Sequence, residues 1–446
     1  MNIIIAGDGE VGFHLAKSLS KIRHNITVID PHSDLLAMLQ SEADLMTITG
    51  SSTSIGTLKE AGVSSCDLLI SALHDENINL ITCILGKRLG VKRTIARVSS
   101  IEYLDETNKQ MFKGFGVDEM VSPERIAAKE ITNLLTRTAA TEIFDFANGL
   151  LSVYMMRLGS SALILDKTLA EISKEYPDIE ARTIRIIRQG KVIIPDGNDK
   201  YLRGDMIYLV AKASSLEKIN ELGGKKVFNI KSAIIAGGGR VARRTAMNLQ
   251  NTISLKIIEK DRQKCFNLSN DLSNTMIING DANDISLLMA EGLENTDAFI
   301  AVTESTETNI LSCLHAHKHG VKKTIALVEN ISYIDVSQDI GIDTIINKKL
   351  IAASYIARFT LAPNVTNSKW LAGMDAECIE IIAKEKSLVT KIPLRDLKIP
   401  YGASIGGIIR HNTAYIAKGD FQIETGDRVV VFTSPEAATK IVKLFN

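Results

Sequence analysis

The sequence lacks any apolar run of the roughly 18 residues that a membrane-spanning helix needs. It also lacks a charge excess, because 52 Lys and Arg residues balance 52 Asp and Glu residues. Without a basic excess, non-specific binding to nucleic acid is not expected. No signal peptide precedes the first apolar run, which begins at Ile3. We therefore expect a cytoplasmic protein without a nucleic-acid partner, which would reach a membrane only through a membrane-embedded protein.

Cysteine is scarce, and its spacing indicates no metal or redox motif. The chain has five cysteines, none of them in a Cys-x-x-Cys pair, so we expect reduced, buried thiols. His315 and His319 lie four residues apart and would share a helix face, a spacing that can hold a transition metal. No carboxylate or thiol completes the set, so a polar helix face is the simpler interpretation and we predict no metal site.

The sequence does contain a long internal repeat. The segment "IIIAGDGEVG" from Ile3 is echoed by "AIIAGGGRVA" from Ala233, and Gly7 and Gly237 are 230 positions apart. The same separation relates "GVKRTIARV" at 90–98 to "GVKKTIALV" at 320–328. Agreement in one register over this length indicates that a module has been duplicated.

In each copy, short β-rich runs alternate with segments of helical length. The strands predicted in the first copy are residues 3–7, 25–30, 45–49, 67–73, 93–98 and 119–122. Nearly continuous apolar strands that alternate with helices predict a parallel sheet covered on both faces. Shorter strands and turn signals follow each copy and predict a small domain. The predicted fold class is α/β, with two Rossmann-like, doubly wound parallel-sheet domains, each followed by a small α+β domain.

This pattern predicts four domains, joined by helices at 122–142 and 347–363. The Rossmann-like domains are expected at residues 1–122 and 230–350, and the small domains at 140–225 and 366–446. The small domains also share a register, because Asp205 and Asp427 are 222 positions apart and each precedes a predicted buried strand.

The first glycine-rich segment has the spacing of a dinucleotide-binding loop. It directly follows a predicted strand and opens a predicted helix, and an acid follows at the end of the next strand. Glycines allow the backbone to approach a phosphate, the helix start offers free N–H groups, and the acid accepts hydrogen bonds from ribose hydroxyls. The acid should also disfavour NADP. The predicted ligand residues are Gly7, Asp8, Gly9, Glu10, Val11, Gly12 and Asp30. The alternative is a glycine turn that binds nothing.

The second copy repeats the segment with two changes. Ala242 replaces the third glycine, which the fingerprint permits, and Glu259 stands where the first copy has Asp30. The predicted ligand residues are Gly237, Gly238, Gly239, Arg240, Val241 and Glu259. The alternative here is a duplicated domain that keeps its fold and has lost its site.

Several further segments match a known family in order and spacing. They include "LKEAGVSSCDLLISA", "ARVSSIEYL", "IIEKD", "NGDANDISLL" and "TNILSC", in addition to both glycine segments. On these segments the whole chain resembles the TrkA family, the regulatory subunits of bacterial Trk potassium uptake systems. The resemblance implies that each half is an RCK module (regulator of conductance of potassium), made of a Rossmann-like domain and a small C-terminal domain.

The resemblance also implies ligands and partners. The expected cofactors are NAD(H) and, especially at the second site, ATP or ADP. The expected partners are an integral membrane potassium transporter subunit of the TrkH or TrkG type and further copies of the chain, in a tetrameric ring that is peripheral on the inner face of the membrane. Nucleotides would then gate ion flow.

Further ligand residues follow from the resemblance, residue by residue. In the first copy these are Ser51, Leu73, His74 and Arg97. In the second copy they are Asp281, Thr303 and Glu304, whereas Leu327 departs from the Arg97 pattern. The alternative for Arg97 is a surface ion pair with Glu102.

Two other functions compete with the transport regulator. An NAD-dependent oxidoreductase would need a general acid or base in its small domains, but residues 144–224 contain no histidine and residues from 373 onward only His411. We therefore predict that the chain is not an enzyme. A scaffold with decayed sites is the third possibility, and the intact first loop counts against it.

The two loops differ in charge after their second glycine, where Glu10 corresponds to Arg240. A carboxylate there repels added phosphate charge, whereas an arginine attracts it. The interpretation is that the first site favours NAD(H) and the second accepts ATP or ADP. The alternative is that both side chains point into solvent.

Overall fold

The computed structural model describes residues 1–7, 9–20, 24–136, 142–225, 228–330, 333–360, 364–370 and 376–446. The chain forms two compact units. The first contains Met1–Ile126, Lys348–Pro363 and Ser368–Trp370, and the second contains Ala127–Asn347, Asn364–Asn367 and Leu371–Asn446. Among the described residues, no helix is both long and apolar enough to cross a membrane.

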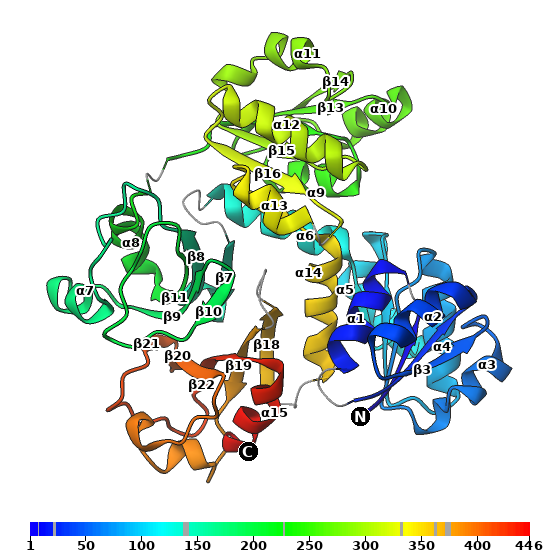
Figure 1. Ribbon diagram of the computed structural model, residues 1–446. Helices are drawn as coiled ribbons and strands as arrows, with labels where there is room; N and C mark the ends of the chain where they lie inside the picture. Colours follow the sequence, from blue (N-terminus) through cyan, green and yellow to red (C-terminus); the bar gives the residue numbers. More distant parts are fainter. Residues whose placement is uncertain are drawn as a thin grey trace. The chain divides into compact units, whose positions relative to one another are not determined.

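A parallel sheet of six strands forms the centre of the first unit, in the order β3-β2-β1-β4-β5-β6 (Figure 1). The strands are β1 Asn2–Ala6, β2 Asn25–Asp30, β3 Met46–Thr49, β4 Leu68–Ser71, β5 Arg93–Arg97 and β6 Glu119–Val121. The helices between them are α1 Glu10–Ser20, α2 Ser33–Glu42, α3 Ile55–Glu60, α4 Glu76–Arg88 and α5 Glu106–Phe115. Ile3 and Ile5 pack on one face and Ile4 on the other. Burial on both faces explains why the strands are apolar throughout, and it confirms the predicted doubly wound sheet.

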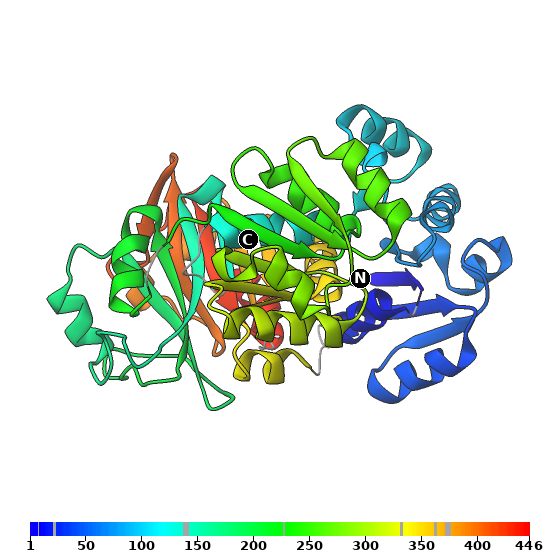
Figure 2. The same ribbon diagram turned by 90° about the horizontal axis from the view of Figure 1, so that it is seen from above.

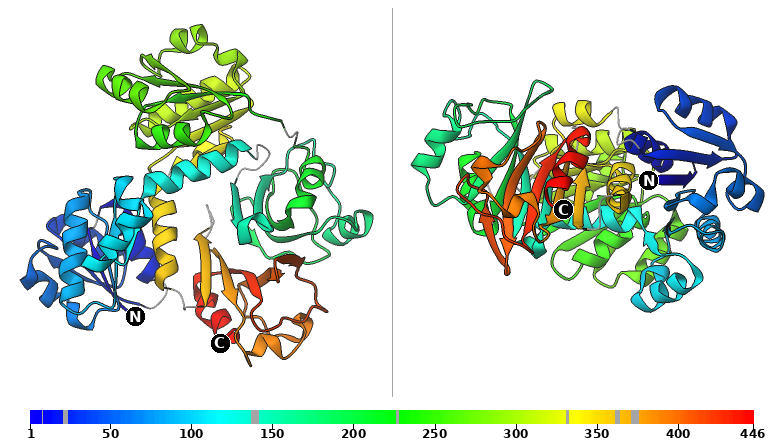
Figure 3. Two further views of the ribbon diagram at one scale, coloured as in Figure 1. Left: turned by 180° about the vertical axis from the view of Figure 1, so that it is seen from behind. Right: turned by 90° about the horizontal axis from the view of Figure 1, so that it is seen from below.

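A helix from much later in the chain completes the core of this unit. Helix α14 (Lys348–Ala357) packs along α1. Its Ala353 and Ile356 are buried in the same cluster as Leu15 and Leu19. Just beyond α14, the Phe359 ring lies 4.5 Å from the Arg93 guanidinium. Figure 3 shows α14, in gold, beside the blue first domain. The sequence predicted a linking helix here, but not this contact.

The second parallel sheet repeats the first strand for strand. Its order is β14-β13-β12-β15-β16-β17. The strands are β12 Ser232–Ala236, β13 Ser254–Glu259, β14 Thr275–Asn279, β15 Ala298–Ala301, β16 Lys323–Leu327 and β17 Thr344–Ile346. The helices are α9 Arg240–Leu249, α10 Arg262–Asp271, α11 Ile285–Ala290, α12 Thr306–Lys318 and α13 Ile334–Asp339. The duplication therefore extends to the topology.

Helix α6 (Pro123–Thr136) lies beside the second sheet's first helix, although it follows the first sheet in the chain. Its Thr132 hydroxyl accepts a hydrogen bond of 3.2 Å from Asn248 of α9, and Ala127, Ala128 and Ile131 of α6 are buried. Because α9 is the duplicate of α1, each of these helices is contacted by a helix that follows the other copy's sheet: α14 packs on α1, and the Thr132–Asn248 hydrogen bond joins α6 to α9. The two copies thus exchange helices.

Each small domain is a five-stranded sheet with short helices. The first has the order β10-β9-β11-β8-β7 and the second β18-β19-β22-β20-β21. The first contains β7 Glu142–Phe146, β8 Leu151–Arg157, β9 Ala181–Arg188, β10 Lys191–Ile193, β11 Met206–Lys212, α7 Leu169–Glu175 and α8 Leu216–Leu222. The second contains β18 Val365–Trp370, β19 Glu377–Ile382, β20 Ala403–Arg410, β21 Thr413–Ile416, β22 Arg428–Thr433 and α15 Pro435–Leu444. The strand pairs between β7 and β11 are antiparallel, as predicted for small α+β domains.

The two small domains share one core, and Figure 2 shows their strands stacked. Phe146 and Tyr208 of the first domain are buried in one cluster with Phe432 of the second. The buried Arg185 donates to Ser404 Oγ and to the Gly402 carbonyl, both at 3.1 Å. Arg182 donates to the Ala417 carbonyl at 2.9 Å. Apolar packing and buried polar contacts thus join the domains.

The aspartates that marked the small-domain register each hold an arginine. Asp205 accepts two hydrogen bonds of 2.8 Å from Arg188, and Asp427 accepts bonds of 2.9 and 2.7 Å from Arg410. Both carboxylates are buried. A two-pronged guanidinium–carboxylate pair of this kind is among the stronger polar contacts, which explains why both copies retain the Gly-Asp turn.

The exchanged helix gives a stability prediction. Ile356→Ala should lower the free energy of unfolding by about 2–5 kcal/mol, because it leaves a cavity between α14 and α1. Ile81→Ala is the control, since Ile81 is 48% exposed and belongs to the same unit. Urea unfolding of both variants measures the difference. An equal, small effect of the two substitutions would contradict the packing of α14 on the first core.

Candidate nucleotide-binding sites

The first glycine loop runs from β1 into α1 at the carboxyl edge of the sheet. Gly7 has a φ of +101°, and its N–H donates to the Ile29 carbonyl at 2.9 Å. A Cβ on Gly7 would lie 3.1 Å from the Leu73 nitrogen, and one on Gly12 only 1.8 Å from the Gly7 carbonyl oxygen. A Cβ on Gly9 would meet no protein atom within 4 Å. The loop therefore packs tightly at Gly7 and Gly12 and leaves open space at Gly9, where a ligand can approach.

Two charged residues predicted in this loop cannot be placed in the site. Asp8 and the side chain of Glu10 lie outside the described residues, so the charge beside the loop rests on the sequence alone. Glu10 is the first residue of α1, and the next residue of this helix, Val11, is buried. Val11 thus contacts the core from this position.

Asp30 is the last residue of β2, next to the loop strand in the sheet. Its carboxylate is buried, and its Oδ1 accepts the N–H of His32 at 2.9 Å. The His32 ring Nδ1 lies 2.7 Å from the same oxygen. The acid is therefore held in place before any ligand binds.

The remaining predicted residues of the first site follow the other strands. Ser51 lies two residues after the end of β3, and its hydroxyl is 2.9 Å from the Thr53 hydroxyl. Leu73 and His74 come after β4, and Leu73 contacts Gly7. Strands β1 and β4 are parallel neighbours, and the chain continues from β1 to β2 on one side and from β4 to β5 on the other. This is the switch point where doubly wound sheets bind ligands. The structure places Gly7, Asp30, Ser51 and Leu73 at this edge.

Arg97 ends β5 at the same edge but is engaged elsewhere. Its Nη2 lies 3.9 Å from Glu124 Oε1, at the start of α6, and both side chains are mostly buried. The pair is therefore with Glu124 and not with Glu102, as the alternative proposed. Arg97 Nε is buried without a hydrogen-bond partner, so the contact with Glu124 is a loose one.

The second glycine loop repeats the backbone with a different acid. Gly237 has a φ of +95° and packs on Thr303, while Gly239 faces open space. Glu259 Oε2 accepts the Gly238 N–H at 2.7 Å, and Oε1 accepts the Asp261 N–H at 2.8 Å. Both oxygens of Glu259 are thus engaged with the backbone, one of them with the loop itself.

The other predicted residues of the second site are spread over its edge. Arg240 starts α9 and is exposed, and Val241 is buried beneath it. Asp281 accepts the Asn283 N–H at 2.8 Å in the loop after β14. Glu304 is almost fully exposed and lies 3.5 Å from Lys264. Leu327, the duplicate of Arg97, is buried, so this site has no cation at that position.

The histidine cluster and the cysteines, all of them described by the structure, show no metal-binding arrangement. His315 lies in α12, and the His319 ring at its end lies 3.5 Å from Glu294. Within the described ranges, no three His, Cys, Asp or Glu side chains are arranged to hold a metal ion. All five cysteines are free and buried, as predicted. Burial raises the pKa of the Cys66 thiol to about 11, so this thiol is protonated at neutral pH.

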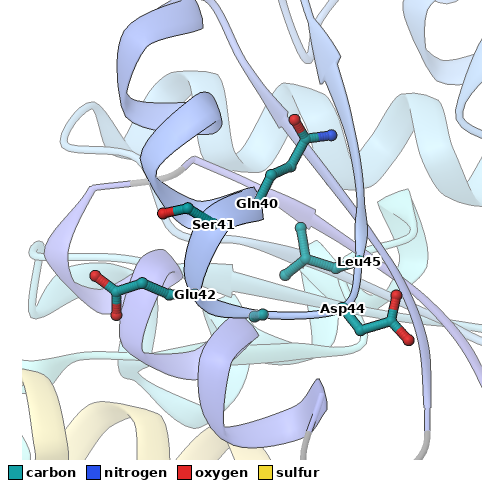
Figure 4. A pocket seen from close by; sticks show the side chains of 6 residues that line it. Gln40, Ser41, Glu42, Asp44 and Leu45 are labelled. Atoms are coloured by element: carbon teal, nitrogen blue, oxygen red, sulfur yellow. The ribbon is translucent and has the colours of Figure 1, made fainter.

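A surface hollow lies elsewhere in the first unit (Figure 4). It is lined by residues 40–45, between the end of α2 and the start of β3. Strand β3 enters the sheet there, at the edge opposite the glycine loop. The hollow contains none of the predicted ligand residues.

Models of two domain families match the chain in alternation. The TrkA-N domain matches residues 3–123 and 233–348, and the TrkA-C domain matches residues 153–223 and 378–446. The chain belongs to the TrkA family. A Trk system potassium uptake protein TrkA of Haemophilus influenzae is 32% identical over 100% of the chain and 98% of its own length. A TrkA homolog 1 of Methanosarcina mazei is 30% identical, with both chains fully covered. The TrkA family consists of transport proteins, so the chain is not an oxidoreductase.

Solved structures agree with the fold of this TrkA-family chain. The GsuK RCK domain superposes with a TM-score of 0.62 at 16% identity, covering 100% of the chain and 94% of its own. The GsuK channel bound to NAD gives 0.61 at 18% identity, covering 100% and 78%. At this identity the likeness concerns the fold alone, and it agrees with two successive modules of a parallel-sheet domain and a small domain.

Sequence reasoning missed two positioning residues of this TrkA-family chain, Asn79 and Asn309. The Asn79 side chain accepts the Leu73 N–H and donates to the Leu73 and Arg97 carbonyls, each at 2.9 Å. Asn309 makes the matching bonds to Thr303 and Leu327. Each asparagine fixes the loop that supports the first glycine. The signal was an asparagine that recurs 230 positions further on in the second copy.

The loop glycines give a paired prediction. Gly7→Ala should destabilise the fold by about 1–3 kcal/mol, because alanine at positive φ is strained and its Cβ meets the Leu73 backbone. Gly9→Ala should leave stability nearly unchanged, since its Cβ enters open space. Chemical unfolding of both variants distinguishes them, and equal stability of the two proteins would refute the loop geometry.

Proposed function

We propose that the chain is the nucleotide-responsive regulatory subunit of a membrane potassium uptake transporter. The main support is full-length similarity of about 30% to Trk potassium uptake proteins, together with a glycine loop and a buried acid at the switch point of the first sheet. The GsuK structures bound to NAD and to ADP support nucleotides as ligands of this fold. The proposed partner is an integral membrane subunit of the TrkH or TrkG type, with the chain in a tetrameric ring on the cytoplasmic side.

The first site is proposed to bind NAD(H). In this proposal the N–H groups at Gly9 and the start of α1 face the pyrophosphate, Asp30 binds the ribose, and Leu73 and His74 contact the adenosine. Ser51 and Arg97 complete the edge, although Arg97 must leave Glu124 to reach a phosphate. We also propose that the four domains span residues 1–122, 140–225, 230–350 and 366–446.

The second site is proposed to accept ATP or ADP. The exposed guanidinium of Arg240 at the start of α9 is available to a terminal phosphate. Glu259 already accepts the Gly238 N–H, so a ligand that uses this N–H must first displace the carboxylate. Asp281, Thr303 and Glu304 surround the same edge. The exposed Arg240 where the first copy has Glu10, and the buried Leu327 where it has Arg97, favour a division of ligands between the copies.

Gating requires that a ligand bind one conformation better than another. The loop that would hold the nucleotide continues into α1, and α1 packs on α14. In the sequence, the second small domain follows α14. A nucleotide that favours one position of α1 therefore also favours one position of α14, which provides a route out of the site.

The first site gives a binding prediction. Asp30→Ala should weaken NADH binding at least tenfold, because a ribose hydrogen bond to a charged acceptor is worth about 1.5–3 kcal/mol. Asp34→Ala is the control, since Asp34 is an exposed acid four residues further on. Isothermal titration calorimetry of the full chain measures both affinities. Unchanged NADH affinity in Asp30→Ala would remove Asp30 from the site.

The function is tested by ion flux. Liposomes that contain the membrane subunit and the full chain should change their potassium flux when NADH or ATP is added. Asp30→Ala should abolish the NADH response, and Arg240→Glu the ATP response. Membranes without the chain are the control. If neither nucleotide alters the flux of a confirmed complex, the regulatory function is wrong, and if each variant loses both responses, the division of ligands is wrong.

A further inference from the structure

His32 is placed where a helix normally receives a capping side chain, but it does not cap. It is the N-cap residue of α2 and forms no side-chain bond to that helix. Its duplicate, Asp261, caps α10 by accepting the N–H groups of Gln263 at 2.8 Å and Lys264 at 3.0 Å. Helix α2 of the first copy therefore begins without a side-chain cap, and the His32 side chain makes a different contact.

That contact is with the proposed ribose-binding acid. His32 Nδ1 lies 2.7 Å from Asp30 Oδ1, and the His32 side chain is 70% exposed, against 5% for Asp30. The imidazole thus lies on the solvent side of the carboxylate. In the second copy Glu259 has two backbone N–H groups as partners, and its neighbour Asp261 is itself an acid. The imidazole beside the acid is a property of the first site.

The ligand atom nearest to this pair would be the 2′ substituent of the adenosine ribose. A 2′-hydroxyl can donate to Asp30, but a 2′-phosphate is repelled by it, and sites that accept the phosphate supply a cation nearby. A protonated imidazole would balance the Asp30 charge and could donate its outer Nε2–H to a phosphate oxygen. His32 is thus the group whose protonation can neutralise the local negative charge.

We propose that His32 determines the specificity of the first site, and that its protonated form admits dinucleotides with a 2′-phosphate. The proposal rests on the proposed nucleotide site and deepens it. Asp30 on β2 is the charged partner of the ring, and Asp34 lies two residues further along α2. Asp8 and the Glu10 side chain of the neighbouring glycine loop are outside the described residues.

The direction of the pH effect follows from the charge. Lowering the pH from about 8 to about 6 favours the charged form of a histidine over its neutral form. The ratio of the NADPH to the NADH dissociation constant should therefore fall as the pH falls. The 2′-phosphate itself gains a proton in the same range, so the effect must be compared with a variant that cannot titrate.

The test uses calorimetric titration of the full chain with NADH and with NADPH at about pH 6 and about pH 8. In the native protein the dissociation-constant ratio should fall about fivefold more than in His32→Asn, which keeps a donor near Asp30 without a titrating charge. His32→Asp should weaken NADPH binding at both pH values and leave NADH binding measurable. Thermal unfolding checks that both variants are folded, as expected for an exposed side chain.

The possible outcomes distinguish the proposed role of His32 from the proposed nucleotide site on which it rests. Equal pH dependence in the native protein and in His32→Asn, with NADH bound by both, would overturn the role of His32 and leave the nucleotide site standing. NADPH binding that His32→Asp does not weaken would also overturn it. Absence of NADH binding to the native protein at both pH values would overturn the nucleotide site itself, and this inference with it.

Discussion

The first parallel sheet depends on α14, a helix that comes from a distant part of the chain and not from the segments that connect its own strands. Helix α1 presents Leu15 and Leu19 to the sheet, and α14 packs over them with Ala353 and Ile356. Because α1 starts at the glycine loop, the contact that completes the core also steadies the helix whose N–H groups would face a phosphate. Stability and site geometry therefore rest on one packing interface, formed by segments more than half a chain apart.

The duplication preserved the sheet and changed the acids at its edge. A Cβ on Gly238 would lie 3.0 Å from the Glu259 Cβ and 2.6 Å from Leu268, so the second loop needs glycine where Glu259 folds back on it. Asp30 is one methylene shorter, and its described partner is His32. Both acids accept the N–H two residues further on, and the residue that donates it is a histidine in the first copy and an aspartate in the second.

Local pattern was enough to predict the strands, their parallel sheets and the edge on which Gly7, Asp30 and Leu73 meet. Apolar runs and turn residues act over a few positions, and the carboxyl ends of parallel strands always share an edge. No local sequence pattern of this kind indicates which distant segments of the chain will be in contact. The packing of α14 on α1, the choice of Glu124 by Arg97 and the shared core of the small domains depend on shapes that only the folded chain brings together.

The exchange of helices also bears on why the two modules form one polypeptide. If they were separate chains, α14 would reach the first sheet only by association, and the stability of that sheet would rise and fall with protein concentration. A covalent link turns this association into an intramolecular step with a fixed effective concentration. The first module then keeps its covering helix at any expression level, however dilute the protein.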